Sequence, residues 1–163
     1  MAAVHSEIPP ESGSSPVESF TEVRYGETDQ MGYAHHATAV LWFELGRVRW
    51  LRHHGLSYRA LEESGFLLPV VDMHICYHAP GRFEDALAIE TRLAGTGRCR
   101  VNFDTRVLRV ETDKNRTLLL SGEVQLACVD REERRPTRLP PALRALAERL
   151  HNNPSRTSAH GFR

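Results

Sequence analysis

The chain has few cysteines, and they are widely separated. Cys76, Cys99 and Cys128 are odd in number and form no CxxC pair. Neither a disulfide framework nor a zinc site is therefore expected. We interpret all three as small buried apolar residues of a protein in a reducing compartment. The adjacent His53 and His54 have no second group of ligands at metal-binding spacing, so no metal is expected either.

Charge of one sign and long apolar runs are also missing. The 21 Lys and Arg residues balance 21 Asp and Glu residues, so nothing global attracts nucleic acid, although local arginines could still hold a phosphorylated ligand. No stretch approaches the ~18 apolar residues of a transmembrane helix. The first twenty residues lack the basic and apolar parts of a signal peptide. We expect a cytoplasmic protein with no membrane span and no nucleic-acid partner.

A length of 163 residues with 40% hydrophobic content suits one domain. Residues 1–18 are rich in Pro, Ser and Glu, and residues 152–163 have a similar composition. Such segments bury too little apolar surface to offset the entropy of ordering. We therefore expect disordered tails at 1–18 and 152–163 around a domain at 19–151.

The hydrophobic pattern predicts one long helix from Thr38 to His54, followed by the stop signal Gly55. Apolar residues recur along it at spacings of four, three and three, at Leu41, Leu45, Val48 and Leu51. Its first half, AVLWFEL, is apolar nearly all round, which predicts a helix enclosed by other structure. A short helix is expected at 58–64, and a last one in LPPALRALAERL.

Alternating apolar and polar residues predict strands. One precedes the long helix at 21–25, and four follow it near 71–78, 86–93, 98–107 and 120–128. Turn signals separate the later runs, as in a largely antiparallel sheet with one polar face. The fold class is therefore α+β: a curled antiparallel sheet of about five strands around one long central helix.

The loop between the first strand and the long helix, YGETDQMGYAHHA, concentrates titratable residues. Loops at such junctions often carry function. A helix start offers unpaired backbone N–H groups and a partial positive charge. An acid facing these donors could attack a carbonyl that they polarise, or activate water against it.

This loop reads Y-x-x-x-D-x-x-G-x-x-x-H and is followed by WFELGRVRWLRHHG and then Y-x-x-P-x-x-F-x-D. Over about residues 20–130 the chain resembles the 4-hydroxybenzoyl-CoA thioesterase family of hotdog-fold proteins. It is most similar to the branch of small acyl-CoA thioesterases found with the Tol-Pal system. The resemblance implies a hotdog fold and hydrolysis of an acyl-CoA to free acid and CoA. No cofactor is expected, since CoA is part of the substrate.

The resemblance also implies site roles. Asp29 would be the essential carboxylate, acting as a nucleophile or as a general base on water. The backbone N–H near His36 would polarise the thioester carbonyl. Tyr25 and the His36 side chain would orient the water or Asp29. Many relatives have Asn where this chain has Thr38, which could keep a hydroxyl at that contact or cap the helix.

Seven residues are candidates for substrate binding: Gly32, His35, Thr38, Glu44, Arg82, Arg98 and Arg100. Gly32 would permit a backbone turn or a close approach of ligand. Glu44 is the alternative catalytic acid, but an ion pair with Arg47, or a role as a buried polar anchor, is favoured. The three later arginines could grip CoA phosphates, although solvated charge is the default for a surface arginine.

The sequence leaves several questions open. It does not identify the acyl group, and acyl carrier protein is an alternative to CoA as the carrier. A non-catalytic acyl-CoA binding module and an acyl hydratase or dehydratase on the same fold are alternative functions. The D-x-x-G-x-x-x-H spacing speaks against the hydratase. Open sheet edges and the resemblance predict a homo-oligomer, a dimer at minimum and a tetramer if dimers pair.

Overall fold

The computed structural model describes residues 15–112 and 115–152. Its elements, in chain order, are β1 (Val17–Glu22), η1 (Tyr25–Glu27), α1 (Thr38–His53), α2 (Tyr58–Glu63), β2 (Phe66–Leu67), β3 (Val70–Tyr77), β4 (Ala86–Thr96), β5 (Arg100–Val110), β6 (Arg116–Ala127), β7 (Val129–Asp130) and α3 (Pro141–Asn152). The predicted tails overlap this description at their inner ends, and residues 1–14 and 153–163 lie outside it.

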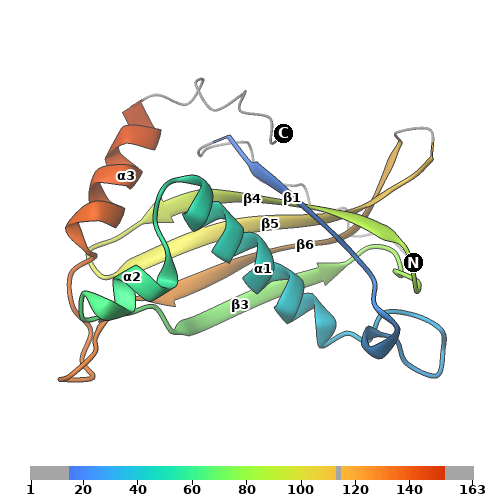
Figure 1. The fold of residues 1–163 in the computed structure, drawn as a ribbon, viewed down its shortest axis with the longest axis horizontal. Helices are drawn as coiled ribbons and strands as arrows, with labels where there is room; N and C mark the ends of the chain where they lie inside the picture. Colours follow the sequence, from blue (N-terminus) through green and yellow to red (C-terminus); the bar gives the residue numbers. More distant parts are fainter. Residues whose placement is uncertain (1–14, 113–114, 153–163) are drawn as a thin grey trace, which may run out of the picture.

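Five antiparallel strands form the main sheet in the order β1-β4-β5-β6-β3, with α1 lying across one face (Figure 1). The predicted α+β fold with five strands around one long helix is confirmed. The strands β4, β5 and β6 follow their predicted alternation, whereas on β3 Met73 and Ile75 are half-buried but Val71 and Tyr77 are exposed. The first strand begins earlier than expected, at Val17, so the end of the predicted tail belongs to the sheet. Tyr25, predicted to lie in that strand, starts the 3-10 turn η1.

The helix α1 has almost its predicted bounds, but its buried face is not the predicted one. Its buried apolar residues are Ala39, Trp42, Phe43, Trp50 and Leu51. Leu41, the first residue of the predicted stripe, is 53% exposed. Because the helix is apolar nearly all round, periodicity could not choose the face. In the single chain α1 is covered by the sheet on one side and is not enclosed.

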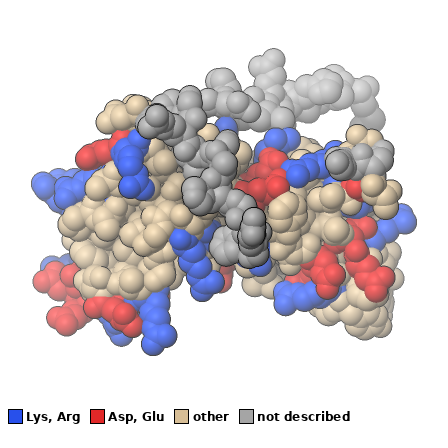
Figure 2. Space-filling view, turned by 45° about the horizontal axis from the view of Figure 1, so that its top comes forward, with Lys and Arg blue, Asp and Glu red and all other residues tan. Residues whose placement is uncertain are grey.

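The opposite face of the sheet is polar and carries paired charges. Arg92 binds Asp104 across two strands, with its Nη2 2.9 Å from a carboxylate oxygen. Arg116 of β6 reaches across the sheet to Glu18 on β1 and Glu90 on β4. In Figure 2 acidic and basic side chains are interspersed over the visible surface rather than gathered by sign. The ion pairs of Arg92 and Arg116 balance positive and negative charge on this face of the sheet.

Two features were not expected from the sequence. The very short strands β2 and β7 pair antiparallel in a second small sheet. The cysteines also differ in their burial: Cys128 is buried, whereas Cys76 and Cys99 are half-buried. Burial raises the pKa of the Cys128 thiol to about 11. The expectation of three buried cysteines is therefore correct only for Cys128.

Candidate active site

The loop 25–37, here called the catalytic loop, is built on the buried carboxylate of Glu27. Arg24 binds this carboxylate through its backbone N–H and its Nε, both at 2.9 Å. The Glu27 carbonyl in turn accepts the backbone N–H of His35 at 2.7 Å. These bonds fix where the chain leaves η1 and where it enters α1. Sequence reasoning missed this anchor, because Glu27 has the composition of an ordinary surface residue.

Asp29 lies in a small closed turn within the catalytic loop. Its backbone N–H donates to the Tyr33 carbonyl at 2.9 Å, and its own carbonyl accepts from Gly32 at 3.0 Å. Its Oδ1 accepts the Met31 N–H at 2.9 Å, which orients the carboxylate as in an Asx turn. Gly32 has φ of +76°, so its predicted role in the turn is confirmed. Among the described residues, Oδ2 of Asp29 has no partner, and the side chain is partly exposed.

The start of α1 carries an unused donor. The backbone N–H of His36 has no hydrogen-bond acceptor in residues 15–112 and 115–152, whereas its carbonyl accepts the Tyr77 hydroxyl at 3.0 Å. His35 Nδ1 accepts the Ala37 N–H at 3.2 Å, so this imidazole satisfies part of the helix start. The ring centres of His35 and His36 lie 4.1 Å apart, and the two rings are tilted against each other. A free N–H beside the positive end of a helix suits a developing oxyanion.

The loop that connects β3 and β4, residues 78–85, supports the catalytic loop from outside. The Gly81 carbonyl accepts the Ala34 N–H at 2.9 Å. The Arg82 guanidinium lies 5.8 Å from the centre of the Tyr33 ring. Beside this loop is a cavity of about 690 Å³, whose lining includes Arg82, Asp85 and Arg109.

Tyr25 and Thr38 make contacts that the sequence did not predict. The Tyr25 side chain is 79% exposed and packs edge-on against Phe83, with ring centres 5.6 Å apart. No hydrogen bond joins its hydroxyl to Asp29 in the described part of the chain. Thr38 is not the helix cap, since Ala37 occupies that position. Its buried hydroxyl donates to the Glu27 carbonyl at 3.3 Å, because it is turned into the core.

Glu44 and Arg47 do not form the predicted ion pair in the part of the chain that the structure describes. Glu44 is exposed on α1, while Arg47 is buried and donates from Nε to the Tyr58 hydroxyl at 2.8 Å. The prediction was wrong because Arg47 points toward α2 and not along the helix surface.

The three candidate phosphate-binding arginines do not converge. Arg82 lies beside the catalytic loop, in the segment that leads into β4. Arg98 and Arg100 follow the other end of β4. Because an eleven-residue strand is about 35 Å long, they lie roughly that far from Arg82. Both are exposed, and Arg100 donates to the Gln125 amide oxygen at 2.6 Å. Within one chain, therefore, Arg82 is brought to the site and the other two are not.

Comparison with known proteins places this site in a family. The family model described as thioesterase-like superfamily matches residues 23–146, which include the whole catalytic loop. The chain belongs to this family. Within it, the acyl-CoA thioester hydrolase YbgC of Escherichia coli O6:H1 is 34% identical over 121 residues, 74% of this chain and 87% of that protein.

Solved structures confirm the hotdog fold. A hypothetical protein from Thermus thermophilus is 34% identical, with a TM-score of 0.75 over 82% of this chain and 98% of its own. A 4-hydroxybenzoyl-CoA thioesterase variant, crystallised with 4-hydroxybenzoyl-CoA, has the same TM-score at 17% identity. It covers 82% of this chain and 99% of its own, and this likeness concerns the fold alone.

Among the described residues, no group of three or more His, Cys, Asp and Glu side chains is arranged to hold a metal ion. No helix in residues 15–112 and 115–152 is long and apolar enough to cross a membrane.

Proposed function

We propose that the protein hydrolyses acyl-CoA thioesters to a free acid and CoA, with Asp29 as the reacting carboxylate. The observation that carries this proposal is that one short loop holds two unused groups of the required kinds, an acceptor and a donor. Asp29 keeps one carboxylate oxygen without a partner, and the His36 N–H at the helix start is also unpartnered among described residues. A relative that is 34% identical is named an acyl-CoA thioester hydrolase, which supports the same reaction.

In the proposed reaction the thioester carbonyl oxygen accepts the His36 N–H, and negative charge develops there as the carbonyl carbon becomes tetrahedral. As a nucleophile, Asp29 forms a mixed anhydride and expels CoA thiolate; water then cleaves the anhydride and restores the carboxylate. As a general base, Asp29 takes a proton from water, whose oxygen attacks the same carbon; the tetrahedral adduct then expels CoA thiolate, which takes up the proton. Both routes yield one acid and one CoA, and the geometry of the loop suits either.

We further propose that two copies pair through β3. His78 donates its N–H to Leu119 on β6, so the alternation of an antiparallel strand turns the N–H groups of Met73, Ile75 and Tyr77 away from the sheet. The opposite edge is partly blocked, because Arg49 of α1 donates to the Phe20 carbonyl on β1 at 2.6 Å. An open edge invites a second strand, and in a dimer Arg98 and Arg100 of a second copy are the candidates for holding CoA phosphates.

The carrier and the cellular location belong to the same proposal. We favour CoA over acyl carrier protein, because Arg82 beside the catalytic loop offers a charged donor to a phosphate. Half-buried free thiols at Cys76 and Cys99 suit a reducing cytoplasm.

The direct test is release of free thiol from a panel of aliphatic and aromatic acyl-CoAs, with one acyl carrier protein thioester for comparison. The proposal predicts catalytic turnover of at least one acyl-CoA. Binding of acyl-CoA without thiol release across the panel would instead identify a binding module.

A further inference from the structure

Arg47, in the middle of α1, is a buried cation whose hydrogen bonds are incomplete. It is 5% exposed, and its Nε donates to the Tyr58 hydroxyl at 2.8 Å. Its Nη1 is sealed from solvent and has no partner among the described residues. Burying a charged donor without an acceptor is costly. A donor left in this state calls for an acceptor that the single chain does not supply.

Tyr58, the first residue of α2, adds a second donor at the same place. Its oxygen receives the Arg47 N–H, so its own proton is left for another acceptor. Burial, the largest influence, raises the pKa of Tyr58 above its ordinary value, so the phenol stays protonated at neutral pH. The Arg47–Tyr58 pair therefore offers two hydrogen-bond donors and lacks an oxygen that accepts from them.

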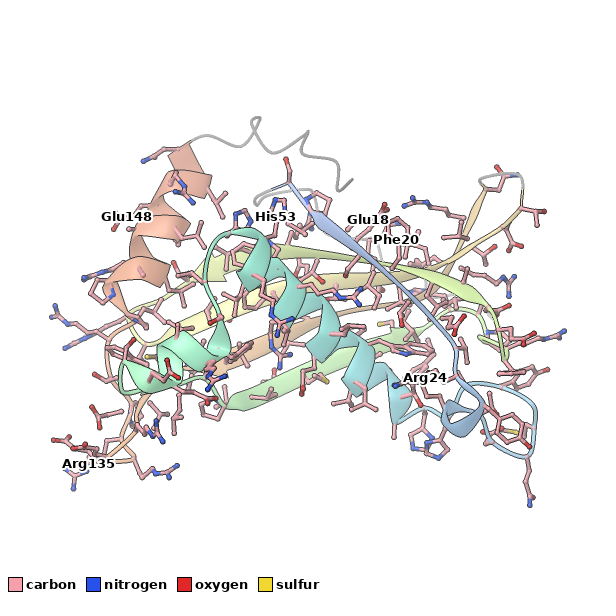
Figure 3. All side chains as sticks on the ribbon, viewed as in Figure 1. Glu18, Phe20, Arg24, His53, Arg135 and Glu148 are labelled. Atoms are coloured by element: carbon pink, nitrogen blue, oxygen red, sulfur yellow. The ribbon has the colours of Figure 1, made fainter. Side chains whose placement is uncertain are left out.

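This pair lies on the side of α1 that faces β3. Arg49 reaches the Phe20 carbonyl on β1, the opposite edge of the sheet, and Figure 3 shows Phe20 on the far side of α1 from α2. Two residues along a helix turn the side chain by about 200°, so Arg47 points the other way. Val40 and Glu44 precede Arg47 by seven and three residues, so the three side chains form one stripe along α1. The stripe begins just after His36, where the thioester carbonyl is proposed to bind.

The β3 side of this stripe is partly apolar and partly open. Met73 and Ile75 are half-buried against the core, and Tyr77 on the same strand face reaches the His36 carbonyl. Val40 of the same stripe is exposed on α1. An acyl chain that starts at the His36 N–H and follows this stripe would contact these apolar side chains before it reaches the Arg47–Tyr58 pair.

We infer that the Arg47–Tyr58 pair selects acyl groups that carry a distal oxygen. This inference rests on the proposed function, since it assumes that the acyl group starts at His36. Eleven residues separate His36 from Arg47, about 16 Å along the helix axis. Side chains lean toward the helix start by roughly one turn, which leaves about 11 Å. An extended chain covers that distance in about nine bonds.

One terminal oxygen of an acyl chain has the lone pairs to accept from both donors. Because Arg47 is a cation, a neutral and an anionic oxygen can both accept from it. The substrate class is therefore a medium-length acyl-CoA with an oxygen-bearing terminal group.

The test compares kcat/KM for matched acyl-CoAs with and without a terminal hydroxyl, from hexanoyl to dodecanoyl, with the dicarboxylic sebacoyl-CoA added. We expect ω-hydroxydecanoyl-CoA to exceed decanoyl-CoA by at least ~10-fold, since each matched hydrogen bond is worth about that factor. Sebacoyl-CoA, which carries a terminal carboxylate, should likewise exceed decanoyl-CoA. A wild-type enzyme that prefers the plain acyl chain at every length would overturn the inference, while its turnover of those chains would leave the proposed function intact.

Variants identify the residues responsible. Tyr58→Phe removes one hydroxyl, and Arg47→Met replaces the guanidinium with an apolar chain; each should reduce the hydroxy preference to below ~2-fold while decanoyl-CoA turnover persists. Arg52→Met, at an exposed position in the last turn of α1, is the matched control and should keep the full preference. If Arg47→Met does not fold, Tyr58→Phe decides alone. Retention of the preference in Tyr58→Phe would contradict the assignment.

Discussion

The hydroxyl of Tyr77 donates to the backbone carbonyl of His36 over 3.0 Å, between residues 41 positions apart. Tyr77 ends the edge strand β3, and His36 carries the unpartnered N–H at the start of α1. This bond ties the open edge of the sheet to the residue proposed to hold the thioester carbonyl. A substitution on the β3 edge can therefore alter the position of His36 through the Tyr77 side chain.

Tyr77→Phe should lower kcat by roughly 3- to 10-fold, because one hydrogen bond contributes about 1 kcal/mol to holding the peptide in place. The ring and its packing stay, so the melting temperature should shift by less than ~3 °C. Steady-state kinetics and thermal unfolding on the same sample check this. A large loss of melting temperature with unchanged kcat would make Tyr77 a purely structural residue.

The β3 edge predicts an association that one substitution can weaken. Light scattering at micromolar concentration should give at least twice the 18.5 kDa of one chain. Val71→Lys on β3 should shift the mass toward the monomer and reduce activity, because a charge there opposes burial. Phe20→Lys on β1 is the control, since both side chains are similarly exposed, 57% for Phe20 and 51% for Val71. Equal effects of the two variants, or a fully active monomer, would contradict pairing through β3.

Gly46 sets how closely α1 approaches the sheet. A Cβ at this position would overlap Thr91 Oγ1 and lie 2.8 Å from Ile89 Cγ2. Gly46→Ala should therefore lower the free energy of unfolding by about 1–3 kcal/mol despite the better helix propensity of Ala. Gly95→Ala, with open space around its Cβ, should change it by less than ~1 kcal/mol. Denaturant unfolding of both variants gives the comparison.

His54, packed on Trp50 with ring centres 4.3 Å apart, predicts a pH dependence of stability. Burial, with help from the charges of His53 and Arg149, lowers the pKa of His54 from 6.5 to about 4. Between these values the unfolded chain binds the proton and the folded one does not, so the free energy of unfolding falls as pH drops from 6.5 to about 4. His54→Gln should lose less stability over this window than wild type, and His151→Gln on α3 should behave like wild type. Identical pH profiles for wild type and His54→Gln would contradict this assignment.

The fold was predictable because its signals are local. Alternation along β4, β5 and β6 marks their buried faces, and Gly55 marks the end of α1. The buried side of α1 was not predictable, because AVLWFEL is apolar on every side and only contact with the sheet distinguishes Trp42 from Leu41. The small β2–β7 sheet was missed since two-residue strands have no period.

The site was predictable as a loop and less so as a set of contacts. The run from Tyr25 to Ala37 stood out by composition, and Gly32 behaves as its residue type suggests. Bonds between distant segments, such as Tyr77 to His36 or Arg47 to Tyr58, depend on the packing of β3 and α2 against α1. No spacing in the sequence encodes them. The same limit applies to Thr38, for which a helix cap was one of two expected roles, whereas Ala37 occupies that position.

The central claim is that Asp29 is the reacting carboxylate, and Asp29→Asn tests it most directly. The substitution removes the charge at nearly constant volume and keeps an oxygen that can accept the Met31 N–H. Thiol release from the best acyl-CoA should fall at least ~100-fold in kcat with an unchanged melting temperature. Glu44→Gln, at the exposed carboxylate on α1, is the control and should lose less than ~10-fold. A folded Asp29→Asn enzyme within about threefold of wild type, or a Glu44→Gln variant more damaged than it, would contradict the account.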